Sequence, residues 1–221
     1  MNKDEILNKV GLVESFIPFG MKNRKGVPII PTTITIHNTG NPNKGADAQA
    51  HARFVTTKGF NTYRGNKSWV SWHFTVDDKN TIKHLPLNEF ALHAGPKANT
   101  SSIAIENCMN EGIDFALSRE RLITLVASLM HDMHFSIGQI RSHRDWTGKD
   151  CPTLILEEWQ DFIDDVEQVY LDINSTDKLL ISVDELGFEP LESERELDDD
   201  DLSNEIDHEL MLDSMSEFIS D

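Results

Sequence analysis

The sequence predicts an α/β fold, because segments with the periodicity of strands alternate with segments that have the periodicity of helices. Residues 33–37 and 102–108 alternate β-branched or apolar residues with polar ones. Within residues 117–135, apolar residues recur three and four positions apart, as on the buried side of a helix. A change in charge near residue 156 then separates this folded part from a strongly acidic C-terminal segment.

The first 30 residues are expected to form an arm that leads into the first strand. Residues 11–30 are interrupted by Pro and Gly, and residues 22–26 form a local basic cluster. A solvated loop is the simpler interpretation of this cluster, and a groove lining that meets anionic groups is the functional one. The strand after the arm ends at His37, where an Asn-Thr-Gly run interrupts it.

An amphipathic helix and two neighbouring strands are predicted next. The helix spans residues 45–57, and His51 within it is expected to be structural or exposed. Residues 70–76 alternate as in a strand, and a hairpin turn at 77–80 leads into a second strand at 81–85. His73 lies in the first of these strands, where a core histidine is the simplest interpretation.

Two further polar residues are expected beside a cleft. His93 lies in a loop of small residues, which suits contact with a ligand, and an ordinary surface histidine is the alternative. Glu106 ends the strand at 102–108, where a carboxylate is costly to bury unless it meets a cation or water. The alternative for Glu106 is a carboxylate at the rim that pairs with a lysine.

Two helices are predicted in the second half of the chain. The first spans 117–135, and the second begins near Ile155 and ends near Asn174. The apolar stripe of the first consists of Leu122, Leu125, Val126, Leu129, Met130 and Met133. The stripe of the second consists of Ile155, Trp159, Phe162, Ile163, Val166 and Tyr170, and its acidic face is expected to be solvated.

Between these helices lies half of a metal site. His143 and Cys151 flank a loop that contains Gly148 and ends at a proline. Mixed His and Cys ligation favours zinc, and a catalytic zinc site uses three protein ligands so that water can occupy the fourth position. His37 is the best candidate for the third ligand, although alone it is more simply explained as a histidine at a strand end.

Five motifs, taken in order along the chain, resemble those of the type 2 zinc-dependent N-acetylmuramoyl-L-alanine amidases. This group contains phage endolysins and bacterial autolysins and is related to the peptidoglycan recognition proteins. The resemblance covers approximately residues 31–156, and its motifs lie at 36–39, 71–78, 92–95, 103–106 and 143–152. It implies a mixed β-sheet flanked by helices.

The resemblance also implies a reaction, the hydrolysis of the amide bond between N-acetylmuramic acid and L-alanine in peptidoglycan by a zinc-activated water. The implied metal ligands are His37, His143 and Cys151. Glu106 is expected to act as the general base and Lys149 to stabilise the oxyanion, with an ion pair to Asp150 as the alternative role of Lys149. Substrate contacts are expected from His93, Trp72 and His73.

The chain departs from the family pattern at two positions within these motifs. Trp72 stands where some relatives have a tyrosine with a catalytic role. The tyrosine hydroxyl is therefore missing, and Glu106 becomes the stronger candidate for that role. Leu92 stands where relatives usually have a tryptophan, so an aromatic surface for a sugar is missing.

Charge divides the chain into three predicted parts. Residues 1–156 carry a net charge of +4 and residues 157–221 a net charge of −22. We therefore expect an N-terminal arm at 1–30, a zinc amidase catalytic domain at 31–174, and an acidic, largely disordered tail at 175–221. The tail can form an amphipathic helix at its end, through Leu202, Ile206, Leu210, Met211, Met215, Phe218 and Ile219.

Composition limits where the protein acts and what it binds. The net charge of −18, without a basic stripe, argues against nucleic acid as a partner. We see no signal peptide and no apolar run long enough to span a membrane, so we expect synthesis in the cytoplasm and action on the cell wall by another route. With Cys151 on the metal, Cys108 is expected to be unpaired, and a disulfide between the two is the alternative.

Two other classes of function are compatible with the sequence. One is a peptidoglycan-binding module without activity, although all three metal ligands are retained. The other is an interaction protein that binds a protein partner through its acidic tail.

Overall fold

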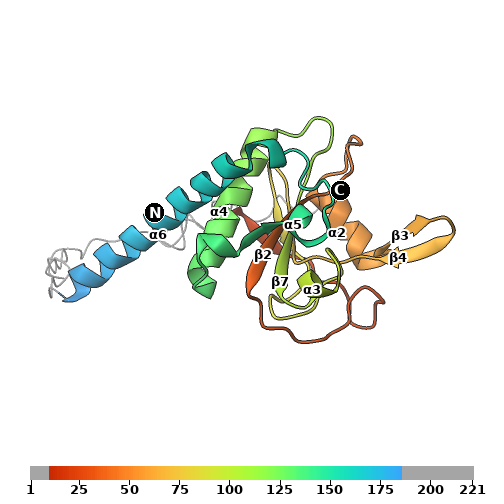
Figure 1. The fold of residues 1–221 in the computed structure, drawn as a ribbon, viewed down its shortest axis with the longest axis horizontal. Helices are drawn as coiled ribbons and strands as arrows, with labels where there is room; N and C mark the ends of the chain where they lie inside the picture. The colour runs from red at the N-terminus through yellow and green to blue at the C-terminus, as the bar shows by residue number, and fades with distance from the viewer. Residues whose placement is uncertain (1–9, 186–221) are drawn as a thin grey trace, which may run out of the picture. The chain divides into compact units, whose positions relative to one another are not determined.

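The computed structural model describes residues 10–185, and a six-stranded sheet lies at the centre of this part (Figure 1). Every neighbouring pair of strands is parallel except β5 and β6, so the sheet is mixed, as expected. Its strands, in spatial order, are β1 (Leu12–Glu14), β6 (Thr81–Lys83), β5 (Phe74–Val76), β7 (Ser102–Asn107), β2 (Thr33–Asn38) and β8 (Ile140–Ser142).

Strand alternation gives the two faces of the sheet different chemistry. Ile34 and Ile36 of β2 and Ile103 and Ile105 of β7 are fully buried in the main hydrophobic core. Because successive side chains point to opposite faces, the residues between them point the other way. His37 and Glu106 are partners in the parallel register of β2 and β7, so both lie at the ends of neighbouring strands on this second face.

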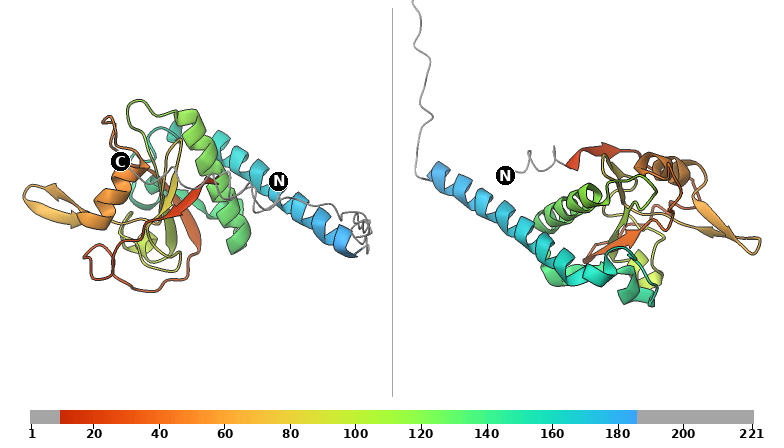
Figure 2. Two further views of the ribbon diagram at one scale, coloured as in Figure 1. Left: turned by 180° about the vertical axis from the view of Figure 1, so that it is seen from behind. Right: turned by 90° about the horizontal axis from the view of Figure 1, so that it is seen from above.

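Helices cover both faces. Helix α4 (Phe115–Met133) and helix α6 (Trp159–Glu185) pack against each other and supply much of the main core (Figures 1 and 2). Helix α2 (Ala48–Thr57) begins at its N-cap Asp47 and lies on the other side of the sheet. Its buried Val55 packs in a smaller core with Trp72, Leu85 and Ala104.

Short elements complete the described chain. They are the hairpin strands β3 (Phe60–Tyr63) and β4 (Asn66–Trp69), helix α3 (Pro96–Asn99), helix α5 (His143–Thr147) and the 3-10 turns η1 (Ile137–Gln139) and η2 (Leu156–Glu158). Strands β1 and β8 and the β3–β4 hairpin were not predicted from the sequence. Strands β1 and β8 have only three residues each, which is too short for an alternating pattern to stand out.

The strand predicted at 70–76 is shorter than expected. It begins only at Phe74, because the backbone before it bonds to several partners instead of one ladder. Ser71 donates its N–H to the carbonyl of Leu92, and Val70 donates to that of Gly59. The turn after Val76 and the antiparallel partner strand β6 are confirmed.

Helix α6 does not end near Asn174 but continues to Glu185. The polar run at 174–176 looks like a terminator in the sequence, yet its side chains bond back to carbonyls of the same helix. Asn174 donates to the carbonyl of Tyr170, and the hydroxyls of Ser175 and Thr176 donate to that of Asp172. The predicted boundary at 174 therefore falls inside a helix.

The part of the predicted acidic tail beyond residue 185, with its amphipathic helix, lies outside the described residues. Cys108 and Cys151 are both free thiols. No helix within the described range is long and apolar enough to cross a membrane.

Candidate metal centre and active site

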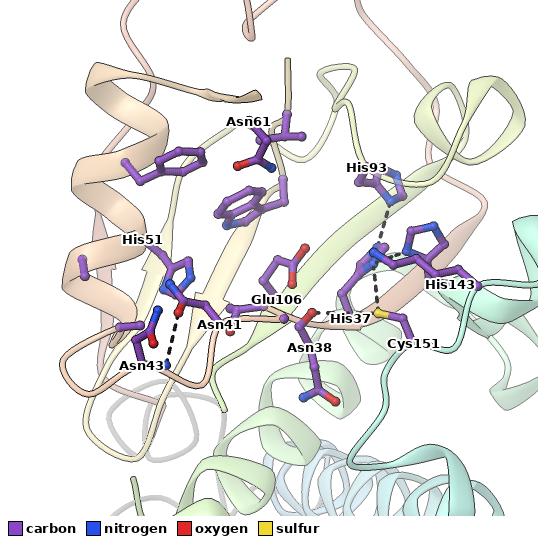
Figure 3. Close-up of a pocket in the computed structure, with 18 of the residues that line it drawn as sticks. His37, Asn38, Asn41, Asn43, His51, Asn61, His93, Glu106, His143 and Cys151 are labelled. Carbon is purple, nitrogen blue, oxygen red and sulfur yellow. Dashed lines mark hydrogen bonds between the residues drawn. The ribbon is translucent and has the colours of Figure 1, made fainter. Parts of the chain in front are cut away.

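Three side chains from distant parts of the sequence converge at the end of the central strands. His37 and His143 offer Nδ1 atoms 3.0 Å apart, and Cys151 Sγ lies 3.8 Å from His37 Nδ1 (Figure 3). All three donor atoms lie within 4.8 Å of one another, and all three residues are buried. The predicted ligand triad is thus assembled in a geometry that can hold a metal ion.

Each ligand is positioned by local structure. His143 is the first residue of α5, directly after the N-cap Ser142, whose hydroxyl accepts the N–H of Asp145. Asp145 in turn accepts the N–H of Ser142 in a reciprocal capping box. The helix ends at Gly148 with φ of 75°, a left-handed conformation that suits glycine and turns the chain toward Cys151.

Asn38 fastens the loop that carries Cys151. Its Oδ1 accepts the N–H of Leu154 at 2.9 Å, and its carbonyl lies 3.9 Å from Cys151 Sγ. The sequence analysis treated Asn38 only as part of the run that ends the strand. Its position directly after His37 was the available signal that it has a role in the site.

Burial keeps both histidine ligands neutral, as metal binding requires. Desolvation lowers the pKa of His37 well below its usual value, and the neighbouring His93 and His143 lower it further. Burial lowers the pKa of His143 to about 4, helped by Lys149. Burial and the Glu106 carboxylate raise the pKa of Cys151 to about 11, so its thiolate needs a cation beside it.

His93 contacts one of the three candidate metal ligands and also lines the pocket. Its Nδ1 lies 3.0 Å from His37 Nε2, the nitrogen opposite the one that faces His143. The other nitrogen of His93, Nε2, is buried without a partner in the described part of the protein. Burial lowers the pKa of His93 to about 3, so a neutral ring can accept the N–H of His37.

Glu106 lies in the same pocket as the triad (Figure 3). Its Oε2 is buried and has no hydrogen-bond partner within residues 10–185. Burial raises the pKa of its carboxyl to about 8, and Lys149 opposes this. The alternative of a rim carboxylate paired with a lysine is not what the structure shows, because no ion pair to Glu106 forms within the described chain.

Lys149 lines the pocket together with Glu106 and the triad. The alternative partner considered for it, Asp150, instead forms an ion pair with Arg144. The ammonium group of Lys149 is therefore available to a ligand that enters the pocket.

The two aromatic residues predicted to contact substrate have different surroundings. Trp72 lines the pocket but is only 6% exposed, and its indole N–H donates to Thr75 Oγ1. His73 is fully buried outside the pocket lining, where one ring nitrogen contacts the carbonyl of Glu89 and the other accepts the N–H of Ala104. The structure thus places His73 in the core and does not bring it to the site.

The pocket has a volume of about 740 Å³ and extends from the triad toward α2. Several amide side chains that the sequence analysis did not single out line it: Asn38, Asn41, Asn43 and Asn61. His51 also lines it, with its Nδ1 2.9 Å from the carbonyl of Asp47. None of residues 22–26 lines the pocket, and Arg24 is buried in an ion pair with Glu89.

Comparison with known sequences gives one consistent answer. Residues 26–154 match the sequence profile of a family described as N-acetylmuramoyl-L-alanine amidase. The chain is 41% identical over 156 residues to the N-acetylmuramoyl-L-alanine amidase XlyA of Bacillus subtilis and 38% identical over 161 residues to CwlH of the same organism. These matches cover 69% and 71% of this chain but only 50% and 61% of the relatives, so the chain corresponds to part of their length.

Comparison with solved structures supports the same relationship. The catalytic domain of XlyA superposes with a TM-score of 0.64 at 40% identity, and the match covers 71% of this chain and 99% of that domain. The structure of PlyL gives a TM-score of 0.59 at 29% identity over 71% of this chain and 95% of its own.

Proposed function

Since the chain belongs to the N-acetylmuramoyl-L-alanine amidase family, we propose that it hydrolyses the amide bond between N-acetylmuramic acid and L-alanine in peptidoglycan. One observation carries this proposal beyond family membership: the His37, His143 and Cys151 donors converge in the same pocket as an unpaired Glu106 carboxylate. A binding module without activity needs neither a buried metal triad nor a free carboxylate beside it.

Zinc fits the donor set. With zinc–nitrogen bonds of ~2.05 Å and a zinc–sulfur bond of ~2.3 Å, a tetrahedral ion separates two nitrogens by about 3.3 Å and nitrogen from sulfur by about 3.6 Å. The corresponding separations from His37 Nδ1 are 3.0 Å to His143 Nδ1 and 3.8 Å to Cys151 Sγ. When bound, zinc supplies Lewis acidity to the scissile carbonyl and the attacking water.

The protein residues around this site perform the proton transfers. The Glu106 carboxylate accepts the proton of the attacking water and delivers it to the leaving amine of L-alanine. The positive charge of Lys149 stabilises the negative charge that develops on the carbonyl oxygen. With a metal on His37 Nδ1, the ring proton of His37 would lie on Nε2, where His93 Nδ1 is placed to accept its hydrogen bond and fix the orientation of the ring.

Mass spectrometry of a soluble muramoyl peptide incubated with the protein tests the proposal. We expect a product with a free L-alanine amine and a product with the muramic lactyl carboxylate, and no reaction after chelation. The Glu106→Gln variant should keep its metal but lose most turnover, by about 10²–10⁴-fold, because an amide cannot accept the proton.

The matched control is Glu111→Gln, which alters an exposed carboxylate outside the pocket. Cleavage at a different bond would contradict the proposed reaction. Near-normal turnover by the Glu106→Gln variant would assign the base role to another residue.

A further inference from the structure

The β3–β4 hairpin lies at the edge of the pocket and presents one face away from it. Its two strands pair antiparallel and are not joined to the central sheet. In all three ribbon views the hairpin extends beyond the end of α2, away from the six-stranded sheet (Figures 1 and 2). Residues 64–68 at and after its turn are exposed. A two-stranded hairpin without a core has little stability by itself. We therefore consider a role for this hairpin other than stabilising the fold.

The charge around the hairpin is opposite to that of the whole chain. No Asp or Glu occurs between Asp47 and Asp77, whereas this interval contains Arg53, Lys58, Arg64 and Lys67. This basic interval stands out because the chain as a whole has a net charge of −18. A positively charged surface on an otherwise anionic protein attracts anionic groups that come close to that surface.

Three lysines gather around a pair of aromatic rings on this hairpin. Phe60 and Trp69 are direct cross-strand partners, with ring centroids 4.9 Å apart. Lys67 Nζ lies 4.3 Å and Lys58 Nζ 5.3 Å from the Phe60 ring, and Lys22 Nζ lies 5.6 Å from the Trp69 ring. We call Lys22, Lys58 and Lys67 the lysine cluster.

The aromatic rings position the lysine cluster without neutralising its charge. Cation–π attraction fixes the ammonium groups over the ring faces. All three lysines are nevertheless exposed, and none of them forms an ion pair within residues 10–185. Because these contacts already favour one position for each ammonium group, the lysine side chains lose less conformational entropy when a multivalent anion binds them.

The lysine cluster lies beside the pocket rather than in it. In the hairpin register, Lys67 is on the same face as Phe60 and Trp69, and Asn61 points to the opposite face. Asn61 lines the pocket, whereas none of the three lysines does. A partner bound by the lysine cluster therefore sits next to the substrate without displacing it.

We propose that the lysine cluster binds a phosphodiester polymer attached to the bacterial cell wall. This inference rests on the proposed function, which brings the hairpin to the wall. Lysine ammonium groups suit single phosphate charges as compact point charges, and the half-buried rings of Phe60 and Trp69 suit the carbon skeleton of a polyol or sugar. A wall-attached polymer is also tethered near the substrate, so its effective concentration at the hairpin is high.

Binding of the full-length protein to purified walls, with and without their phosphodiester polymer, tests this proposal. The hairpin variant is Lys58→Gln with Lys67→Gln. The control variant is Lys79→Gln with Lys97→Gln, which removes the same charge from exposed positions outside the hairpin. On intact walls at low ionic strength, we expect the hairpin variant to bind about threefold to tenfold more weakly than the control.

On walls stripped of the polymer, wild type and both variants should bind equally. On a small soluble muramoyl peptide, both variants should turn over at the wild-type rate, because the cluster lies outside the pocket. Equal binding of the two variants to intact walls would overturn the inference, as would a loss that persists on stripped walls. Binding of a short DNA duplex that the hairpin mutations abolish, without any effect on walls, would assign the surface to nucleic acid instead.

These outcomes separate the inference from the proposed function. If the wild type does not cleave the soluble peptide, the proposed function fails, whatever the wall-binding result. If it does cleave the peptide but the hairpin variant binds intact walls like the control, only the polymer inference fails.

Discussion

At the scale of single residues, His93 determines how His37 can serve as a ligand. A metal on Nδ1 of His37 requires the ring proton on Nε2, and His93 Nδ1, 3.0 Å from His37 Nε2, can accept a hydrogen bond from that N–H. Removing such a partner of a ligating histidine lowers metal affinity by about 10–100-fold. We therefore expect His93→Ala to weaken zinc binding by this amount, measured by competition with a chromogenic chelator.

His51→Ala is the matched control for this experiment. His51 is a histidine of the same pocket, but its Nδ1 contacts the carbonyl of Asp47 and it is not one of the three converging donors. Unchanged zinc affinity in His93→Ala would show that His93 does not orient His37.

A second prediction at this scale concerns His73 and stability. Burial lowers its pKa from 6.5 to about 4, so the unfolded chain takes up a proton at a higher pH than the folded chain. The contribution of neutral His73 to stability is therefore complete above pH ~6.5 and is lost as pH falls toward ~4, by roughly 3 kcal/mol.

Urea unfolding of wild type and His73→Gln between pH 7 and pH 4 measures this effect. The glutamine variant should be less stable at pH 7, because it replaces a buried, fully hydrogen-bonded ring. Its stability should also fall less steeply with decreasing pH. Parallel pH profiles for the two proteins would exclude His73 as a source of the acid sensitivity.

The residues of the site could be predicted from the sequence to different extents. His37, His143 and Cys151 were accessible because their residue types and order carry the metal chemistry, and the structure brings them together. Asn41 and Asn43 of the pocket wall were not accessible, because asparagine in a loop with Gly and Pro is explained equally well by turn formation. The core position of His73 was the simplest interpretation of its place in a strand and is confirmed, whereas its role as a substrate contact came only from the resemblance.

At the scale of elements, the N-cap of α5 links helix stability to the metal centre. Ser142 caps the helix through the N–H of Asp145, and His143 follows directly. We expect Ser142→Ala to destabilise the protein by about 1 kcal/mol and also to weaken zinc binding. The control is Asp114→Ala, which removes the equivalent cap of α4, where Asp114 accepts the N–H of Leu117 far from any ligand in sequence.

Thermal unfolding and zinc titration of both variants separate the two effects. The Asp114 variant should lose a comparable amount of stability while it keeps wild-type zinc affinity. If both variants bind zinc as the wild type does, the α5 cap stabilises the helix without positioning His143.

The long elements were predictable because their signals span many residues. Helix α4 was expected at 117–135 and is observed from Phe115 to Met133, since its apolar stripe extends over about three turns. The hairpin β3–β4 was missed because it buries little and so has no apolar alternation to detect. The end of α6 was misplaced because the sequence does not distinguish side chains that cap a helix from those that bond back to it.

At the scale of the whole molecule, the main feature that the fold does not explain is the uneven distribution of charge along the chain. A segment at 1–156 with net charge +4 is covalently joined to one at 157–221 with net charge −22. Covalent attachment keeps these charges at a high effective concentration near the catalytic part, whatever their arrangement. Walls that carry anionic polymers should repel such a chain at low ionic strength.

We therefore expect the fragment 1–185 to bind and cleave purified walls faster than the full-length protein at low salt. Cutting after residue 185 rather than at the predicted boundary of 174 keeps α6 whole and removes 14 of the 38 acidic residues together with one arginine. The difference between the two proteins should shrink as salt is added, because the screening length is only ~8 Å at ~0.15 M ionic strength. Both proteins should cleave a small soluble muramoyl peptide equally, since it carries little charge to repel. Equal rates on walls at low salt would show that the acidic segment does not restrain the enzyme, and would favour its role as a docking segment for a protein partner.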